Sequence, residues 1–201
     1  MSNKLVLASG NPGKLREFAD IFSRFQFEVV PQSDFDVPEA EETGLTFVEN
    51  AIIKARNACL HTGLPAIADD SGIEVDALNG APGIYSARYA GSKASDQENL
   101  KTLLTALQGT TKDERSARYH CIIVYLRHAD DPTPLIAQAH WSGRILTSPM
   151  GDGGFGYDPI FWVEQHQCSA AQLSAAQKHA ISHRGQAIRQ FIAQFTLRND
   201  S

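Results

Sequence analysis

The chain has 201 residues, of which 42% are hydrophobic, and its 18 Lys and Arg against 23 Asp and Glu give a formal net charge of −5. This length and composition suit one well-buried globular domain rather than a disordered chain. The negative charge argues against a sequence-independent nucleic-acid binder, which needs a basic surface. No apolar run approaches the length of a membrane span and no signal-peptide core follows Lys4, so we expect a cytoplasmic protein without a membrane partner.

A glycine-rich turn lies between the first predicted strand and the first predicted helix. Residues 5–8 form an apolar run typical of a buried strand, and apolar residues recur at helical spacing over 15–22. The turn between them, Ser-Gly-Asn-Pro-Gly-Lys over 9–14, places backbone N–H groups and Lys14 at a helix N-terminus, where anions bind. It is not a Walker A loop, because the spacing of its glycines differs and Leu15 follows the lysine. A tight turn with a solvated lysine is the alternative interpretation.

The next predicted elements are a strand over 27–30, an acidic connection, and two capped helices. Capping-box patterns over 46–49 and 95–98 open helices that are expected to end near Gly63 and Gly109. Lys54 falls in the first of these helices, away from its apolar stripe.

An apolar strand over 65–68 is predicted to end in Asp69, Asp70 and Ser71. Because side chains alternate across a strand, only one of two adjacent aspartates is expected to face a site. Mg²⁺ takes one or two carboxylates and completes its shell with water and phosphate oxygens, which suits one strand-end aspartate and an acidic residue from 39–42. A turn capped by the aspartate side chain is the alternative.

The last part of the chain predicts a hairpin over 119–141, a strand over 157–163 and a terminal amphipathic helix over 187–195. Phe155 stands between two glycines, so its ring is a candidate for stacking on a nucleobase, although a ring tucked into the core is the alternative. Lys178, His183 and Arg184, near the start of the last helix, offer donors to an oxygen acceptor, unless they are simply solvated.

Together these motifs resemble those of the Ham1/inosine triphosphate pyrophosphatase family, close to its bacterial members. The matching segments are Ser-Gly-Asn-Pro-Gly-Lys at 9–14, Glu-Thr-Gly-Leu-Thr-Phe-Val-Glu-Asn at 42–50, Ala-Asp-Asp-Ser-Gly at 68–72, Gly-Ala-Pro-Gly-Ile-Tyr-Ser-Ala-Arg-Tyr at 80–89, Gly-Gly-Phe-Gly-Tyr-Asp-Pro at 153–159 and Ser-His-Arg-Gly at 182–185. The resemblance implies an α/β fold with a mixed central sheet and flanking helices, in two lobes around a nucleotide-binding cleft. It also implies one domain over residues 1–201 and a homodimer.

The activity that the resemblance implies is Mg²⁺-dependent hydrolysis of the deaminated purine nucleoside triphosphates ITP, dITP and XTP to monophosphate and pyrophosphate. This activity removes them from the nucleotide pool before they enter DNA and RNA. Asp70 would be the catalytic residue, orienting or deprotonating the attacking water, and Glu42 and Asp70 would hold Mg²⁺. A pyrophosphatase for other modified nucleotides, and a non-catalytic nucleotide-binding module, are the alternatives.

The resemblance also implies a set of substrate-binding positions. At the phosphates they are Ser9, Gly10, Asn11, Pro12, Gly13, Lys14 and Lys54. The other substrate-binding positions are Ser71, Phe155, Gly156, Tyr157, Asp158, Lys178, His183 and Arg184. Among these, Phe155 would stack on the base, while Asp158, Lys178, His183 and Arg184 would read the purine edge.

Overall fold

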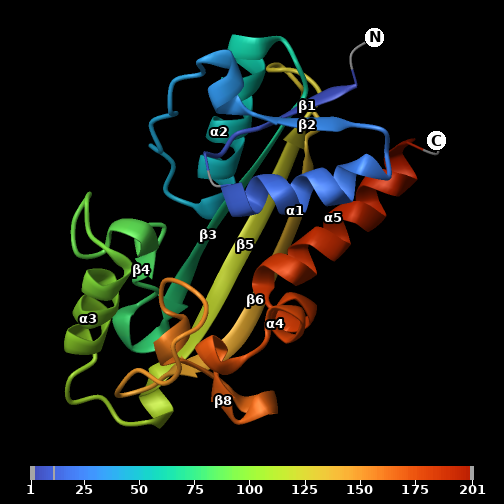
Figure 1. The fold of residues 1–201 in the computed structure, drawn as a ribbon. Helices are drawn as coiled ribbons and strands as arrows, with labels where there is room; N and C mark the ends of the chain where they lie inside the picture. The colour runs from blue at the N-terminus through green and yellow to red at the C-terminus, as the bar shows by residue number, and fades with distance from the viewer. Residues whose placement is uncertain (1–2, 11, 200–201) are drawn as a thin grey trace. The chain divides into compact units, whose positions relative to one another are not determined.

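A computed structural model describes residues 3–10 and 12–199 of the chain. The fold is α/β, as predicted, with helices beside a mixed sheet (Figure 1). The α-helices are α1 (Pro12–Ser23), α2 (Phe47–Thr62), α3 (Asp96–Ala106), α4 (Ala175–Ile181) and α5 (His183–Asn199). The strands are β1 (Lys4–Leu7), β2 (Glu28–Pro31), β3 (Ala66–Val75), β4 (Pro82–Gly83), β5 (Ser116–Leu126), β6 (Leu135–Ile145), β7 (Phe161–Val163) and β8 (Cys168–Ser169). Within the described ranges, none of the helices has the length and hydrophobicity of a membrane span.

The strands form one mixed sheet in the order β2-β1-β3-β5-β6-β7-β8, with β4 paired to β3. Strand β1 runs parallel to both β2 and β3, and the register pairs Val6 with Val30 and with Ala66. The β3–β4, β6–β7 and β7–β8 pairs are antiparallel. Parallel pairs need crossover helices, and α1 and α2 lie in the connections that lead from β1 to β2 and from β2 to β3.

The chain divides into two compact units. Unit 1 contains the chain up to Asp70, residues 122–138 and the chain from Ala187 onward, whereas unit 2 contains residues 71–121 and 139–186. The division falls inside three strands, β3, β5 and β6, and in β3 it separates Asp70 from Ser71. Each unit has its own hydrophobic core.

The core of unit 1 fixes the helix that follows the glycine-rich turn. Phe18 and Phe22 on the inner side of α1 are 1% and 0% exposed, as the helical spacing predicts. The ring of Phe22 packs against Phe191 and Phe195 of α5, with centroid distances of 5.6 and 5.3 Å. Burial of one phenylalanine side chain contributes about 1.5–3 kcal/mol, so these rings fix α1 against α5.

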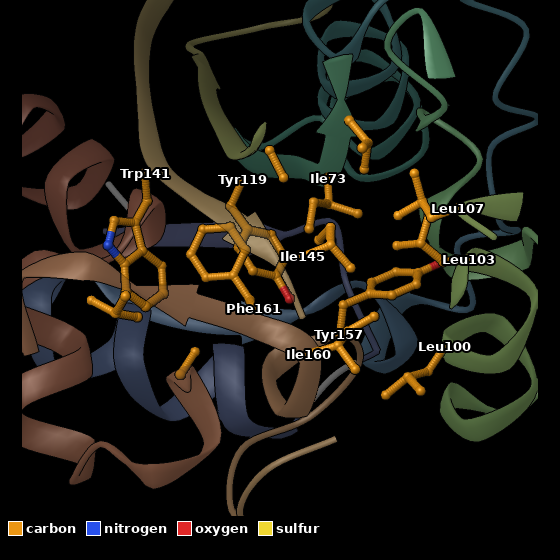
Figure 2. Close-up of a cluster of buried hydrophobic side chains, with 14 residues drawn as sticks. Ile73, Leu100, Leu103, Leu107, Tyr119, Trp141, Ile145, Tyr157, Ile160 and Phe161 are labelled. Atoms are coloured by element: carbon orange, nitrogen blue, oxygen red, sulfur yellow. The ribbon is translucent and has the colours of Figure 1, made fainter. Parts of the chain in front are cut away.

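In unit 2, a second cluster packs α3 against the strands. Figure 2 shows Leu103 of α3 and Leu107, which directly follows this helix, together with Ile73, Tyr119 and other apolar side chains. Figure 2 also shows Tyr157, which belongs to the glycine-rich segment 153–159 and is 5% exposed. The same core therefore anchors both α3 and the segment that carries Phe155.

Three boundaries differ from the predictions. Asp69, Asp70 and Ser71 do not end a strand, because β3 continues to Val75. The place of β3 between neighbouring strands of the sheet outweighs the low strand propensity of these residues. The predicted strand over 157–163 is reduced to β7, since a short 3-10 helix occupies Asp158–Ile160. Lys178 lies in a separate helix, α4, that ends before His183 begins α5.

Candidate functional site

The glycine-rich turn joins β1 to α1 in unit 1. The backbone N–H of Ala8 donates to the carbonyl of Ile67 in β3 at 2.9 Å, so the start of the turn lies beside β3. Ser9 and Gly10 follow β1, and α1 begins at Pro12 and includes Gly13 and Lys14. Asn11 lies outside the described residues.

Lys14 reaches from the first turn of α1 to a buried aspartate. Its Nζ lies 2.7 Å from Oδ1 of Asp69, and the Asp69 side chain is 1% exposed. A buried carboxylate is costly unless it is paired, so this ion pair stabilises Asp69 in the sheet and brings Lys14 beside β3. The neighbouring Asp70 engages a different lysine, as the alternation of side chains along a strand requires.

Lys54 of α2 is shared between two carboxylates. Its Nζ lies 2.8 Å from Oδ1 of Asp70 and 3.0 Å from Oε1 of Glu42, and all three side chains are largely buried. Burial alone would lower the pKa of Lys54, but Asp70, Asp69 and Glu42 outweigh it, so the pKa of Lys54 is raised. Burial raises the pKa of Asp70; Lys54 lowers it, and Glu42 and Asp69 raise it, so the net shift is upward.

The local sequence holds Glu42 near Lys54 through the start of α2. Thr46 caps the helix by accepting a hydrogen bond from the Glu49 N–H at 3.3 Å, as the capping pattern predicts. Buried Asn50 then accepts a hydrogen bond from the Gly44 N–H at 2.9 Å. A Cβ at Gly44 would stand 2.7 Å from the Asn50 side-chain oxygen, so only glycine permits this close approach between the loop and the helix.

Glu42 and Asp70 fit the requirements of a hard divalent cation. Each presents an oxygen within 3.0 Å of the same Lys54 nitrogen, so the two carboxylates already converge around one positive charge. Mg²⁺ typically takes one or two protein carboxylates and fills its remaining positions with water and phosphate oxygens. Among the residues that the structure describes, no group of three or more His, Cys, Asp or Glu side chains is arranged to hold a metal.

Unit 2 contains a pocket that gathers the residues predicted to contact the base, together with the predicted substrate-binding residues Ser71, Gly156 and Tyr157. Its wall includes Ser71, Phe155, Gly156, Tyr157, Asp158, Lys178, His183 and Arg184. These residues come from β3, from segment 155–158, from α4 and from the first turn of α5, which are far apart in the sequence. Asp96, Asn99 and Tyr119 also line this pocket, and none of them was predicted as a site residue.

Phe155 is the most exposed aromatic ring of the pocket. It is 60% exposed, so the alternative in which it tucks into the core is wrong. Gly154 and Gly156 have φ angles of +73° and +60°, a backbone conformation that residues other than glycine rarely adopt. The Nζ of Lys178 lies 4.4 Å and the Cζ of Arg184 5.9 Å from the centre of the ring, within the range of cation–π contacts.

Asp158 connects this loop to α4. Its carboxylate is buried, accepts a hydrogen bond from the Phe155 N–H at 2.8 Å and forms an ion pair with Lys178. Tyr157 is held differently, since its hydroxyl donates to the carbonyl of Ser86 at 2.7 Å, and burial raises its pKa. Tyr157 therefore contributes a wall of the pocket, whereas its hydroxyl is engaged with the backbone.

His183 and Arg184 present different parts of their side chains to the pocket. The His183 ring is buried and stacks on Tyr119, with centroids 4.7 Å apart and an interplanar angle of 7°. The Nη2 of Arg184 lies 3.4 Å from the hydroxyl oxygen of Ser71, which aligns the guanidinium with β3. Burial is the largest cause of the raised pKa of Tyr119, and the nearby Asp158 carboxylate adds to it.

Comparisons with known proteins decide the family. A family model described as the Ham1 family matches residues 5–194. The chain belongs to the Ham1 family. It is 63% identical over 185 residues to the dITP/XTP pyrophosphatase of Vibrio cholerae, covering 92% of each chain, and 58% identical over 196 residues to that of Idiomarina loihiensis, covering 96% of this chain and 97% of the relative.

Solved structures of similar proteins agree with this assignment. A HAM1 protein from Coxiella burnetii superposes with a TM-score of 0.93 at 50% identity, covering 98% of this chain and 99% of that one. A nucleoside-triphosphatase, or dITP/XTP pyrophosphatase, from Mycobacterium abscessus superposes with a TM-score of 0.79 at 39% identity, covering 93% and 96%.

Several contacts of this Ham1 chain could not be predicted from the sequence. Tyr119 reads as an ordinary residue of a buried strand, and Asp96 stands next to the Ser95 cap, so both patterns are explained by local structure alone. No spacing rule links Asp69 with Lys14, because the two residues lie 55 positions apart in the sequence. Asp69 next to Asp70 was the one available signal, and it indicated that the two side chains play different parts.

Proposed function

We propose that this Ham1 protein hydrolyses deaminated purine nucleoside triphosphates, dITP and XTP among them, to the nucleoside monophosphate and pyrophosphate. The observation that carries the proposal is the pocket of unit 2, where an exposed phenylalanine ring lies beside two cations and a buried carboxylate. Such a pocket suits a planar base with oxygen acceptors on its edge. The names of the relatives give the same substrate class.

The lysines of unit 1 are proposed to bind the triphosphate. Lys14 lies in the first turn of α1, where backbone N–H groups and the positive end of the helix dipole favour an anion. Lys54 adds a second positive charge. In the structure Lys14 forms an ion pair with Asp69, and Lys54 forms one with Asp70. Ser9, Gly10, Asn11, Pro12 and Gly13 complete the proposed phosphate turn.

Asp70 is proposed as the catalytic residue. Its largely buried carboxylate lies beside Lys54, where it would orient or deprotonate the attacking water. Glu42 and Asp70 would hold Mg²⁺. When bound, this ion would neutralise phosphate charge and favour ionisation of water. Water would attack the α-phosphorus, and pyrophosphate would leave.

The proposed base selectivity follows from the donors of unit 2. Inosine and xanthosine carry an oxygen at position 6, whereas adenosine carries an amino group. Lys178 and Arg184 are obligate donors, so they favour the oxygen and oppose the amino group. Asp158 pairs with Lys178 and orients its ammonium group, while His183 and Ser71 complete this part of the pocket.

A homodimer is part of the proposal, because the resemblance to the family implies one. Three leucines of unit 1 are strongly exposed, Leu45 at 82%, Leu60 at 65% and Leu197 at 72%. Sedimentation velocity at micromolar concentration measures the oligomeric state, and a single species with the mass of one chain would contradict the dimer.

The activity is tested with a panel of ITP, dITP, XTP, GTP and ATP at equal concentration with Mg²⁺. The proposal predicts rapid turnover of the first three nucleotides and little action on ATP. A pyrophosphatase for other modified nucleotides would leave the first three intact, and a binding module would hold a nucleotide without turning it over.

A further inference from the structure

Asp96 carries a contact that the cap of α3 does not require. The Ser95 hydroxyl oxygen accepts from the Glu98 N–H at 3.3 Å, and the Glu98 carboxylate accepts from the Ser95 N–H at 2.7 Å, so the capping box is complete. The Asp96 carboxylate instead accepts a hydrogen bond from the N–H of Gly156 at 2.7 Å. This bond ties the first turn of α3 to the loop that presents Phe155.

The bond to Gly156 has a counterpart one residue earlier. The N–H of Phe155 donates to the Asp158 carboxylate at 2.8 Å. These two N–H groups belong to the peptide planes on either side of the Phe155 Cα. Fixing both planes fixes φ and ψ of Phe155 and therefore the direction of its Cα–Cβ bond.

The ring of Phe155 depends on this backbone restraint because, beyond the cations of Lys178 and Arg184, its surroundings supply little packing. It is 60% exposed and lies between two glycines, both with positive φ. Glycine is the residue with the largest conformational freedom, so a loop of this composition is costly to order without specific contacts. A hydrogen bond to a carboxylate is stronger than one between neutral groups.

We infer that Asp96 is a positioning residue that holds the Phe155 ring in the orientation used to stack on the base. This inference rests on the proposed function, in which Phe155 stacks on a purine. Asp96 is not one of the residues proposed to bind the phosphates or the metal ion. It acts through the Gly156 N–H and the Phe155 backbone.

The bond itself is tested without turnover by amide hydrogen exchange of residues 153–157. Asp96→Ala is expected to speed exchange in this segment roughly tenfold, because the Gly156 N–H loses its acceptor. Asp96→Asn keeps an acceptor oxygen and is expected to remain within about twofold of the parent. Gln97→Ala changes the next exposed residue of α3 and serves as the matched control. Equal exchange in Asp96→Ala and in the parent would overturn the inference.

The role toward the base is tested with a double-mutant cycle on ITP. Asp96→Ala is expected to raise KM about tenfold with little change in kcat, and Asp96→Asn is expected to restore most of the loss. In a Phe155→Ala background, Asp96→Ala is expected to change KM less than about twofold, because the ring on which it acts is gone. An effect of equal size in both backgrounds would overturn the inference.

The two proposals fail in distinguishable ways. If the parent protein leaves ITP, dITP and XTP intact while Asp96→Ala still speeds exchange in 153–157, the proposed function is wrong and the loop contact is real. If the parent protein cleaves ITP and the cycle is additive, the proposed function stands and the positioning role of Asp96 is wrong.

Discussion

Lys54 and Asp70 form an ion pair, with 2.8 Å between Nζ and Oδ1, and Glu42 binds the same ammonium group from the loop before α2. Asp70 thus stands between a lysine that favours its charged form and two carboxylates that oppose it. A bound cation would add to the effect of Lys54. The charge of Asp70 therefore depends on the groups that surround it.

Asp70→Asn is expected to remove nearly all turnover and to leave the fold intact. Asparagine keeps the shape of the side chain and loses both its charge and its ability to take a proton, a loss that commonly costs two or more powers of ten in rate. The measurement is kcat at saturating Mg²⁺, with circular dichroism to verify folding. Asp76→Asn is the matched control, because Asp76 is an exposed aspartate that pairs with Arg118. Near-parental turnover in Asp70→Asn would contradict the assigned role.

Phe155→Ala is expected to weaken substrate binding with a small effect on stability. Stacking of a base on an aromatic ring contributes about 1–3 kcal/mol, so KM should rise by roughly 5- to 150-fold. Phe22→Ala provides the opposite profile, since this ring is 0% exposed and its loss should cost about 3–5 kcal/mol of unfolding free energy. The check is KM together with thermal melting of both variants. A large fall in the melting temperature of Phe155→Ala with unchanged KM would show that its ring is structural.

Arg184→Ala is expected to narrow the preference for ITP over ATP. The guanidinium offers only donors, so its loss removes a group that pairs with the 6-oxo acceptor and opposes the 6-amino group. Lys14→Ala should instead depress kcat/KM for all triphosphates alike, because every nucleotide carries the same phosphates. The ratio of kcat/KM for the two nucleotides is the relevant measurement. A preference that falls in Lys14→Ala but not in Arg184→Ala would reverse the assignment.

Stability should fall in acid partly through Asp131, in the connection between β5 and β6. Its side chain is 0% exposed and binds the guanidinium of Arg127 as well as the backbone N–H groups of Arg127 and Thr133. Hydrogen bonding from Arg127 is the main reason that the pKa of Asp131 is lowered. Because the folded protein holds the proton less tightly than the unfolded chain does, this stabilisation is full above the unfolded pKa, about 4, and is lost as the pH falls.

Asp131→Asn should therefore lower the unfolding free energy by about 1–3 kcal/mol at pH 7 and flatten its decline below pH 4. Urea unfolding of the variant and of the parent between pH 3 and 7 measures both effects. Asp130→Asn, which changes the exposed neighbour, should behave like the parent. A parallel decline in the Asp131 variant would mean that other carboxylates account for the acid sensitivity.

The sequence predicts the parts of the fold in which local pattern and tertiary packing agree. The spacing of Phe18 and Phe22 gives the buried side of α1, and the Ser95 cap gives the start of α3. The continuity of β3 through Asp70 was not predictable from local propensity, because it depends on the strands paired on both of its sides.

In the candidate site, too, some residues could be predicted from the sequence and others could not. Phe155 stands out locally because glycines surround it, and the resemblance to the Ham1 family supplies the other site positions. Asp96 and Tyr119 reach the pocket only through the packing of α3 and β5, so no spacing along the chain points to them. Contacts of this kind require the folded structure.

The most direct test of the proposed activity is hydrolysis of ITP and ATP, side by side, in ¹⁸O-enriched water with Mg²⁺ and the purified full chain. Products are separated by chromatography and identified by phosphorus NMR and mass spectrometry. The account predicts that ITP yields inosine monophosphate carrying one ¹⁸O atom together with unlabelled pyrophosphate, while ATP remains nearly intact. Release of orthophosphate with a nucleoside diphosphate, label in the pyrophosphate, or equal cleavage of ATP and ITP would contradict it.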